Sequence, residues 1–226
     1  MLPHYFIAGT DTDAGKTLVT CALLRLAAAK GFTSCGLKPI AAGCDNDEGA
    51  WKNADALALI DASTVSLPYS SVNPVALPLP MAPHIAAQQL GLSLSATQLA
   101  KQCEPFIESR NFTLVEGAGG WRVPLNADES MAGLVKALQL PVVLVVGLKL
   151  GCLNHALLTV EAIAGDGLRL SGWVASQTDP DMAVVQENLD TLKTMIDAPC
   201  LGFIPYESSI TPERAARFLD IDKLLK

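Results

Sequence analysis

The stretch GTDTDAGKT, residues 9–17, constrains this chain more than any other part of its sequence. It lies between a short apolar run and a helix-patterned segment, which predicts a glycine-rich turn from a strand into a helix. Free backbone N–H groups at such a helix start attract anionic phosphates, a lysine adds a positive charge, and a threonine hydroxyl can hold Mg²⁺. Lys16 and Thr17 stand at these two positions. The stretch therefore predicts a loop that binds nucleotide phosphates.

The spacing of this loop departs slightly from the strict pattern. Five residues separate Gly9 from Gly15, whereas the pattern has four before Gly-Lys. Either Thr10 stands where the first glycine normally does, or the loop is one residue longer. The alternative, an ordinary turn with a chance Gly-Lys-Thr, fits the flanking strand and helix patterns less well.

Short apolar runs alternate with helix-patterned segments along the chain, which is typical of a parallel sheet covered by helices on both faces. The expected strands are residues 5–8, 33–37, 112–115, 142–146, 172–175 and 200–204, and the expected helices are 18–30, 55–60, 95–109, 131–138, 154–164 and 184–196. The alternation predicts a single α/β domain over residues 1–226. Its doubly wound parallel sheet, of the P-loop NTPase type, would bind ligands at the carboxyl ends of the strands. Residues 67–83 carry five prolines, and we expect a rigid loop there without regular helix or central strand.

Composition limits the classes of partner. Half of the residues are hydrophobic, 17% are charged and the net charge is −7, which argues against nucleic-acid binding. The six scattered cysteines form no Cys-x-x-Cys pair and are typical of small buried side chains in a reducing compartment. No basic segment precedes the first strand, and the longest apolar run, residues 140–148, is too short to cross a bilayer. We expect a soluble cytoplasmic protein that binds no membrane, with an apolar face covered by a partner subunit.

Three charged residues lie where strand ends should meet a nucleotide. Lys38 follows the second expected strand, Glu116 follows the third, and Asp55 stands near a helix start. Carboxylate oxygens are Mg²⁺ ligands, and an acidic residue that ends a buried strand is costly unless it has a partner. We expect Glu116 to hold metal. From the residues alone, Asp55 is equally well explained as a helix N-cap, and Lys38 is better explained as an exposed loop lysine.

Glycines and a helix start mark two further candidate binding segments. Gly117, Gly119 and Gly120 would let the backbone approach a ligand closely. Residues 151–154 precede a helix pattern, so free N–H groups there could receive a carboxylate. His155 follows directly, and a lone histidine in an apolar helix is more often a core or interface residue than a catalytic one.

Together these stretches resemble the dethiobiotin synthetase family, the ATP-dependent cyclo-ligases of biotin biosynthesis. The resemblance covers essentially the whole chain and is carried by the order and spacing of GTDTDAGKT, GLKPIAAG, NADALAL, VNP, APHIA, VEGAGGW, PVVLVVGLKLGCLNHALLT and GWVAS. It implies a homodimer that joins 7,8-diaminononanoate, CO₂ and MgATP through a carbamate and a carbamic-phosphoric mixed anhydride.

The resemblance also implies roles for individual residues. Lys16 and Lys38 would be catalytic, with Thr17, Asp55 and Glu116 around Mg²⁺. ATP would contact Asp13, Ala14, Gly15, Lys16, Thr17, Leu18, Asp55, Glu116, Gly117, Ala118, Gly119, Ser176, Gln177, Pro205 and Tyr206, with a later acidic contact at Glu213. The diamine would contact Thr12, Lys38, Ala42 and, from the neighbouring subunit, Gly151, Cys152, Leu153 and Asn154.

Three positions depart from the family pattern. Ala42 replaces a serine whose hydroxyl contacts substrate, and a lost hydrogen bond of this kind is worth roughly 0.5–1.5 kcal/mol. Ser176 replaces the asparagine that reads adenine, and a hydroxyl cannot reproduce both functions of an amide, so strict ATP preference is open. Asp13 is one methylene shorter than the usual glutamate.

Two rival classes share this loop. Cobyrinic acid diamide synthases carry a glutaminase domain for which 226 residues leave no room. Switch ATPases that partition DNA or place division sites carry a second lysine near the loop start, where this chain has Asp11 and Thr12, and often a basic membrane-binding tail. The final segment, IDKLLK, is too short and too weakly basic for such a tail.

Overall fold

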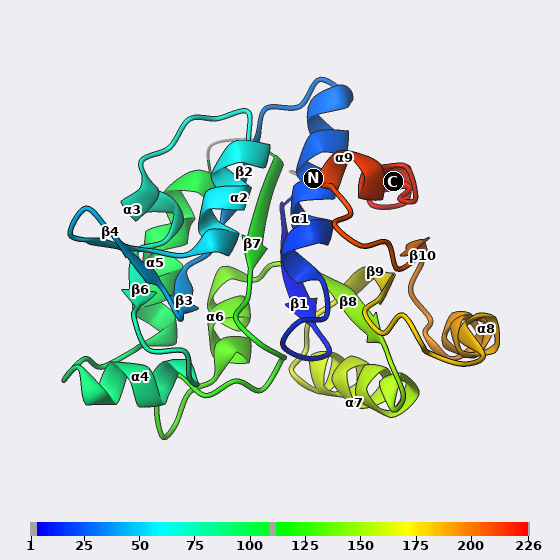
Figure 1. Ribbon diagram of the computed structural model, residues 1–226. Helices are drawn as coiled ribbons and strands as arrows, with labels where there is room; N and C mark the ends of the chain where they lie inside the picture. Colours follow the sequence, from blue (N-terminus) through cyan, green and yellow to red (C-terminus); the bar gives the residue numbers. More distant parts are fainter. Residues whose placement is uncertain (1–3, 109–111, 226) are drawn as a thin grey trace.

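A central six-stranded parallel sheet organises the protein, which we describe from a computed structural model of residues 4–108 and 112–225. The strand order is β10-β9-β8-β1-β7-β2. These strands are β1 (His4–Gly9), β2 (Ser34–Leu37), β7 (Phe112–Glu116), β8 (Val142–Leu148), β9 (Leu170–Gln177) and β10 (Cys200–Ile204). Every pair of neighbours runs parallel, so all six carboxyl ends lie at one edge (Figure 1).

Helices cover both faces of this sheet, because its strands are apolar on both sides. One face packs against α1 (Lys16–Ala29), α2 (Ala54–Ala62) and α9 (Pro212–Ala216), followed by the short 3₁₀ turn η1 (Ile221–Lys223). The other packs against α5 (Ala96–Ile107), α6 (Met131–Leu138), α7 (Cys152–Gly165) and α8 (Val185–Met195). Figure 1 shows α1 crossing the sheet beside α9, which lies near the end of the chain.

The expected strands and helices are confirmed, with shifts of one or two residues at most ends. Residue 109, the end of one expected helix, lies outside the described residues. The doubly wound P-loop type of fold is likewise confirmed, while the extent of the domain, residues 1–226, stays a prediction.

The proline-rich segment is where the prediction was wrong. It contains a one-turn helix, α3 (Tyr69–Val72), and a short strand, β6 (Val75–Leu77), and α4 (Pro83–Gln89) begins at its last proline. Strand β6 pairs in parallel with β3 (Ile40–Ala42), and a separate hairpin joins β4 (Asp45–Asp47) to β5 (Ala50–Lys52). Proline permits these elements because they are short, stand outside the main sheet, or start at the proline itself.

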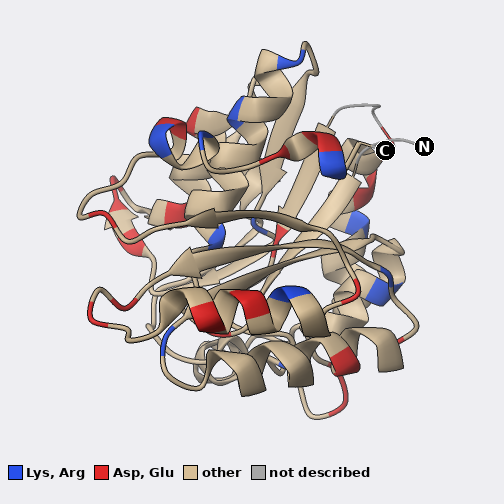
Figure 2. Cartoon of the chain, turned by 90° about the vertical axis from the view of Figure 1, so that its right-hand side faces the viewer, with Lys and Arg blue, Asp and Glu red and all other residues tan. Residues whose placement is uncertain are grey.

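Charged side chains are spread over many elements of the protein. Figure 2 shows Lys and Arg dispersed among Asp and Glu in that view, rather than gathered on one element. In the described part of the chain, no helix is both long and apolar enough to span a membrane.

Candidate functional site

The loop between β1 and α1 has the geometry of a phosphate cradle. Gly15 has φ +89° and Asp13 has φ +57°, both left-handed, and α1 begins at Lys16. A Cβ on Gly9 would lie 2.9 Å from the backbone carbonyl oxygen of Asp11, so this position requires glycine. Thr10 instead accepts a hydrogen bond from the Gly147 N–H at 3.2 Å. The loop is therefore one residue longer than the strict pattern, with Gly9 as its first glycine.

Lys16 lies folded over this loop. Its side chain is buried, and Nζ donates to the Asp11 carbonyl at 2.8 Å. Burial lowers the pKa of Lys16, and the nearby positive charge of Lys38 lowers it further. A buried ammonium bound to a neutral carbonyl gains strongly from an anion, so this geometry favours phosphate binding.

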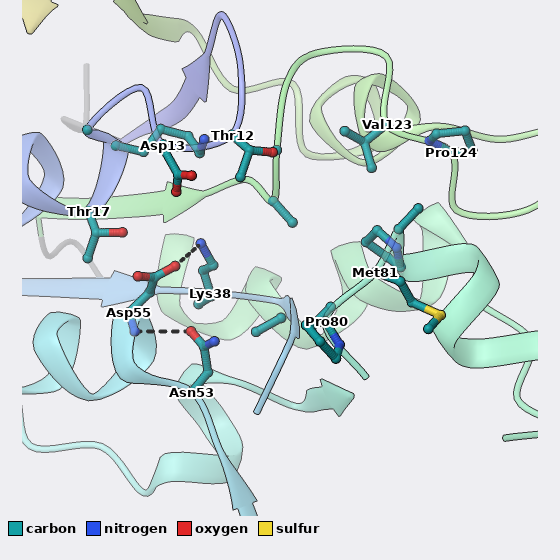
Figure 3. A pocket seen from close by; sticks show the side chains of 18 of the residues that line it. Thr12, Asp13, Thr17, Lys38, Asn53, Asp55, Pro80, Met81, Val123 and Pro124 are labelled. Atoms are coloured by element: carbon teal, nitrogen blue, oxygen red, sulfur yellow. Dashed lines mark hydrogen bonds and ion pairs between the residues drawn. The ribbon is translucent and has the colours of Figure 1, made fainter. Parts of the chain in front are cut away.

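A buried ion cluster lies beside the loop. Lys38 Nζ is 2.6 Å from Glu116 Oε1 and 2.9 Å from Asp55 Oδ2. The Glu116 side chain is fully buried, that of Lys38 is 5% exposed and that of Asp55 is 43% exposed. Lys38 also donates to the Gly117 carbonyl at 3.3 Å. Figure 3 shows the Lys38 ammonium directed at the Asp55 carboxylate on the cavity wall.

The charges of this cluster stabilise one another. Burial alone would lower the pKa of Lys38, but the Glu116 and Asp55 carboxylates together raise it above its ordinary value. Burial likewise acts to raise the pKa of Asp55, but the Lys38 charge and hydrogen bonds from Lys38 and Thr17 lower it overall. Lys38 is therefore a cation and Asp55 an anion near neutral pH.

Two threonines of α1 orient Glu116. Thr17 Oγ1 donates to Glu116 Oε1 at 2.8 Å, and Thr20 Oγ1 lies 2.8 Å from Glu116 Oε2. Residues three apart share one face of a helix, so α1 presents both hydroxyls to the same carboxylate. Thr20 is a residue that sequence reasoning missed, although its helical spacing from Thr17 was a usable signal.

Asp55 stands in the first turn of α2 and is not its N-cap, so that alternative was wrong. The cap is Asn53, whose Oδ1 accepts from the N–H groups of Asp55 at 3.1 Å and Ala56 at 3.4 Å. Because Asn53 satisfies the helix start, the Asp55 carboxylate remains free to face Lys38 (Figure 3).

A cavity of about 840 Å³ opens over the loop and the ion cluster. Its polar side is formed by loop residues, Lys38 and Asp55, and its apolar side by residues such as Pro80, Met81 and Val123 (Figure 3). The predicted site residues that line it are Thr12, Asp13, Gly15, Lys16, Thr17, Leu18, Lys38, Ala42, Asp55, Ala118 and Gly119. Such a volume with one polar and one apolar side suits a ligand that carries both kinds of group.

Glycines shape the wall that follows β7. A Cβ on Gly117 would lie 2.8 Å from the Phe6 ring, and Gly119 has φ +64°. Both positions therefore require glycine, whereas a Cβ on Gly120 would meet its nearest neighbour only at 3.7 Å.

The other predicted nucleotide contacts lie behind or beside the loop. A Cβ on Gly15 would lie 2.6 Å from Ser176 Oγ, so this buried hydroxyl backs the loop. Gln177 donates to the Asp179 carbonyl at 3.1 Å and accepts from the Tyr206 N–H at 3.3 Å, which joins the ends of β9 and β10. Ala14 packs against Gly147. Glu213 pairs with Arg25 of α1 at 3.3 Å.

The segment 151–154 does not line this cavity and lies at the start of α7. Gly151 has φ +92° and the preceding Leu150 is 95% exposed. Lys149 connects the segment to the phosphate loop through a 2.7 Å ion pair with Asp11. His155 is exposed, so it is not a core residue of this subunit, and its place at a subunit interface stays a prediction.

The oxygen atoms present fit Mg²⁺. The Thr17 hydroxyl contacts Glu116, and both carboxylates contact Lys38. Asp55 and Thr17 line the cavity, whereas Glu116 lies buried behind it. Oxygen is the donor that magnesium prefers. In the described part of the chain, no three His, Cys, Asp or Glu side chains are grouped to hold a metal by themselves. Phosphate oxygens and water would therefore complete the coordination, as is usual for nucleotide-bound magnesium.

Known proteins resemble this chain at two levels. A family model described as an AAA domain matches residues 4–214. The ATP-dependent dethiobiotin synthetase BioD of Cellvibrio japonicus is 56% identical, covering 98% of this chain and 97% of that protein. The protein of the same name from Chromohalobacter salexigens is 50% identical, covering 94% and 93%.

Solved structures share the fold at low identity. The septum site-determining protein MinD of Pyrococcus horikoshii, complexed with Mg-ADP, has a TM-score of 0.56 at 12% identity, covering 97% of this chain and 88% of that one. The MinD cell division protein of Aquifex aeolicus has a TM-score of 0.54 at 15% identity, covering 94% and 86%.

Proposed function

Because the chain belongs to the ATP-dependent dethiobiotin synthetase family, we propose that it joins 7,8-diaminononanoate, CO₂ and ATP into dethiobiotin, ADP and phosphate. The observation that carries the proposal is the convergence of Lys16, Lys38 and Asp55 on one cavity with an apolar side wall. Phosphoryl transfer depends on alignment and charge neutralisation, which these groups supply. The apolar wall suits the hydrocarbon chain of the diamine.

The phosphate loop and Lys16 bind the β- and γ-phosphates in this proposal. Lys16 moves its ammonium from the Asp11 carbonyl to the phosphate oxygens. Thr17, Asp55 and Glu116 would hold Mg²⁺, which when bound neutralises charge on the phosphates. In this proposal the base contacts the ends of β9 and β10, with Ser176, Gln177, Pro205 and Tyr206, and the contact of Ser176 with Gly15 of the loop supports this.

Lys38 stabilises the reacting groups. One neutral amine of the diamine adds to CO₂ and loses a proton to solvent to form a carbamate, and a carbamate oxygen attacks the γ-phosphorus as ADP leaves. The second amine then attacks the carbamate carbon, phosphate leaves, and that amine loses a proton as the ring closes. Lys38 faces both the carbamate and the transferring phosphoryl group and offsets their negative charge. Thr12 and Ala42 line the substrate side of the cavity.

A homodimer would complete the site. Residues 151–154 stand at the N-terminus of a 14-residue helix and lie outside the cavity of their own subunit. Exposed leucines flank them, Leu150 at 95% and Leu158 at 57%. In the proposed dimer these leucines become buried. The Cys152 N–H already donates to the Lys149 carbonyl at 3.0 Å, so the other N–H groups of residues 151–154 bind the carboxylate of a diamine in the partner's cavity. The six free cysteines fit a reducing compartment, and we place the dimer in the cytoplasm.

The test supplies MgATP, bicarbonate and 7,8-diaminononanoate and measures dethiobiotin by mass spectrometry. We expect product and phosphate in equal amounts, and no product from Lys38→Ala, which should still bind nucleotide through the loop. Phosphate release that needs no diamine, or that only DNA or lipid stimulates, would instead support a switch ATPase. Near-normal turnover by Lys38→Ala would refute the role of this lysine.

A further inference from the structure

The backbone of Lys38 is held from outside the main sheet. The β2–β7 ladder ends with the pair Leu37 and Val115, so Lys38 lies one residue beyond it. Beyond that point, residues of the proline-rich segment make the hydrogen bonds to the Lys38 backbone. The Lys38 N–H donates to the Val72 carbonyl at 2.8 Å, and the Lys38 carbonyl accepts from Asn73 Nδ2 at 2.6 Å.

A chain of hydrogen bonds leads from Lys38 to the capping residue of α2. Asn73 Oδ1 accepts from the Tyr69 hydroxyl at 2.8 Å, and Tyr69 Oη accepts from the Asn53 N–H at 2.7 Å. Asn53 Oδ1 then accepts from the Asp55 N–H at 3.1 Å. The 2.9 Å ion pair between Lys38 Nζ and Asp55 Oδ2 closes this chain into a ring.

The ring allows only one pattern of hydrogen bonds. The Tyr69 hydroxyl donates once and accepts once. Asn73 uses its carbonyl oxygen and donates twice, to the Lys38 carbonyl and, at 3.3 Å, to the Val75 carbonyl. Asn73 is 2% exposed, so an unmade bond there would be costly. Lys38, Asn53 and Asn73 are buried, whereas Tyr69 and Asp55 are half-buried. A network whose buried members are all satisfied specifies a single geometry.

We propose that Tyr69 and Asn73 are positioning residues that fix the Lys38 ammonium relative to the Asp55 carboxylate. Neither residue lines the cavity, so both act through the ring. The inference deepens the proposed function, because it concerns the cation assigned to the phosphoryl group and a carboxylate assigned to Mg²⁺. It also gives the proline-rich segment a purpose: its short turns deliver two side chains beneath the site.

The test compares two tyrosine-to-phenylalanine variants. Tyr69→Phe keeps the aromatic side chain and removes the hydroxyl that bridges Asn73 and Asn53. Tyr5→Phe is the matched control, because the Tyr5 hydroxyl makes a buried hydrogen bond to the Leu224 carbonyl and stands on β1 outside the cavity lining. Asn73→Ala is the harsher second variant. The readouts are binding of a non-hydrolysable ATP analogue with and without Mg²⁺, the Mg²⁺ dependence of that binding, and kcat against KM for the diamine.

We expect both phenylalanine variants to lower stability and Tyr5→Phe to leave every binding and kinetic readout within about twofold. Tyr69→Phe should keep Mg²⁺-free analogue binding, require several-fold more Mg²⁺, and lose roughly tenfold to a hundredfold in kcat, since small misplacements of reacting groups cost that much. Asn73→Ala should change the same quantities in the same direction.

Two results would overturn the inference. The first is identical Mg²⁺ dependence and kcat in the two phenylalanine variants. The second is an equal loss of analogue binding by Tyr69→Phe with and without Mg²⁺, which would indicate general support of the pocket. The Mg²⁺ readout needs no diamine, so a failure of the proposed reaction leaves this test intact.

Discussion

At the scale of single residues, the buried carboxylate of Glu116 explains why its neighbours are needed for stability. It is a fully buried carboxylate, and its partners are the Lys38 ammonium and the hydroxyls of Thr17 and Thr20. A buried charge without a partner is strongly unfavourable, so Lys38 stabilises the fold in addition to its proposed chemical role.

The stability lost on removing Lys38 should therefore be partly restored by also removing the charge of Glu116. In magnesium-free buffer, we expect Lys38→Ala to lose about 3–5 kcal/mol of unfolding free energy, the range for breaking a buried pair. The double variant Lys38→Ala, Glu116→Gln should regain more than half of that loss, because a neutral amide needs no cation. Urea denaturation of the four proteins in this cycle measures the coupling. Purely additive losses would show that the two charges are independent in energy.

At the scale of elements, the phosphate loop depends on contacts from strands far along the sequence. Gly15 rests against Ser176 at the end of β9, and Gly147 at the end of β8 contacts Ala14. The conformation of the loop is therefore set by three parallel strands that end together at one edge of the sheet.

Gly15→Ala should carry two separable costs. A left-handed φ of +89° costs an alanine roughly 1–2 kcal/mol, and its Cβ would lie 2.6 Å from Ser176 Oγ. Adding Ser176→Gly should recover the steric part and leave the backbone part. Thermal unfolding of the two single variants and the double variant checks this, with favourable coupling expected. If Gly15→Ala lowers the unfolding free energy by the same amount in the parent as in the Ser176→Gly protein, the close contact is contradicted.

The ion pair between Asp11 and Lys149 should make stability depend on pH. The hydrogen bond from Lys149 lowers the pKa of Asp11, although burial opposes this. A lowered pKa stabilises the fold above the ordinary value near 3.8, and that stabilisation is lost as the pH falls through the lowered pKa. Asp11→Asn should thus cost about 0.5 kcal/mol at pH 6 and less at pH 3, in the range of exposed pairs. Urea midpoints at both pH values measure this, and an equal cost at both would argue against the pair.

The sequence predicts this protein unevenly, and the reason is the range of the interactions. Buried strands and their helices follow from local apolar patterns, and the candidate role of Glu116 follows from its place after a strand. The candidate role of Lys38 needed the family resemblance, because its place alone suggested an exposed loop lysine. The strand β6 depends on pairing with β3, more than 30 residues earlier, which no local pattern reveals. Tyr69 and Asn73 were missed for the same reason, because their partners Asn53 and Lys38 are distant in sequence.

At the scale of the whole molecule, the exposed start of α7 is the feature that a single subunit leaves unexplained. Leu150 and Leu158 are exposed there, although most apolar side chains of the protein are buried in its core. The low charged fraction of the chain, 17%, also favours a partner that covers apolar surface. The proposed homodimer accounts for both the leucines and the distance of residues 151–154 from their own cavity.

Leu158→Asp should therefore separate the subunits, because a buried unpaired charge at an interface is unfavourable. We expect sedimentation to show a monomer, with raised KM for the diamine and unchanged nucleotide binding. The matched control is Leu92→Asp, at 52% exposure after α4, which should leave the assembly intact. A Leu158→Asp protein that sediments like the parent would place the interface elsewhere.

The resting contact between Lys16 and the Asp11 carbonyl has a consequence for turnover. In the proposed function, the Lys16 ammonium returns to the Asp11 carbonyl when ADP leaves, so it keeps a hydrogen-bond acceptor. The nucleotide thus competes with the Asp11 carbonyl for this ammonium, which lowers nucleotide affinity and speeds exchange. Faster exchange helps an enzyme that must release ADP before each new cycle.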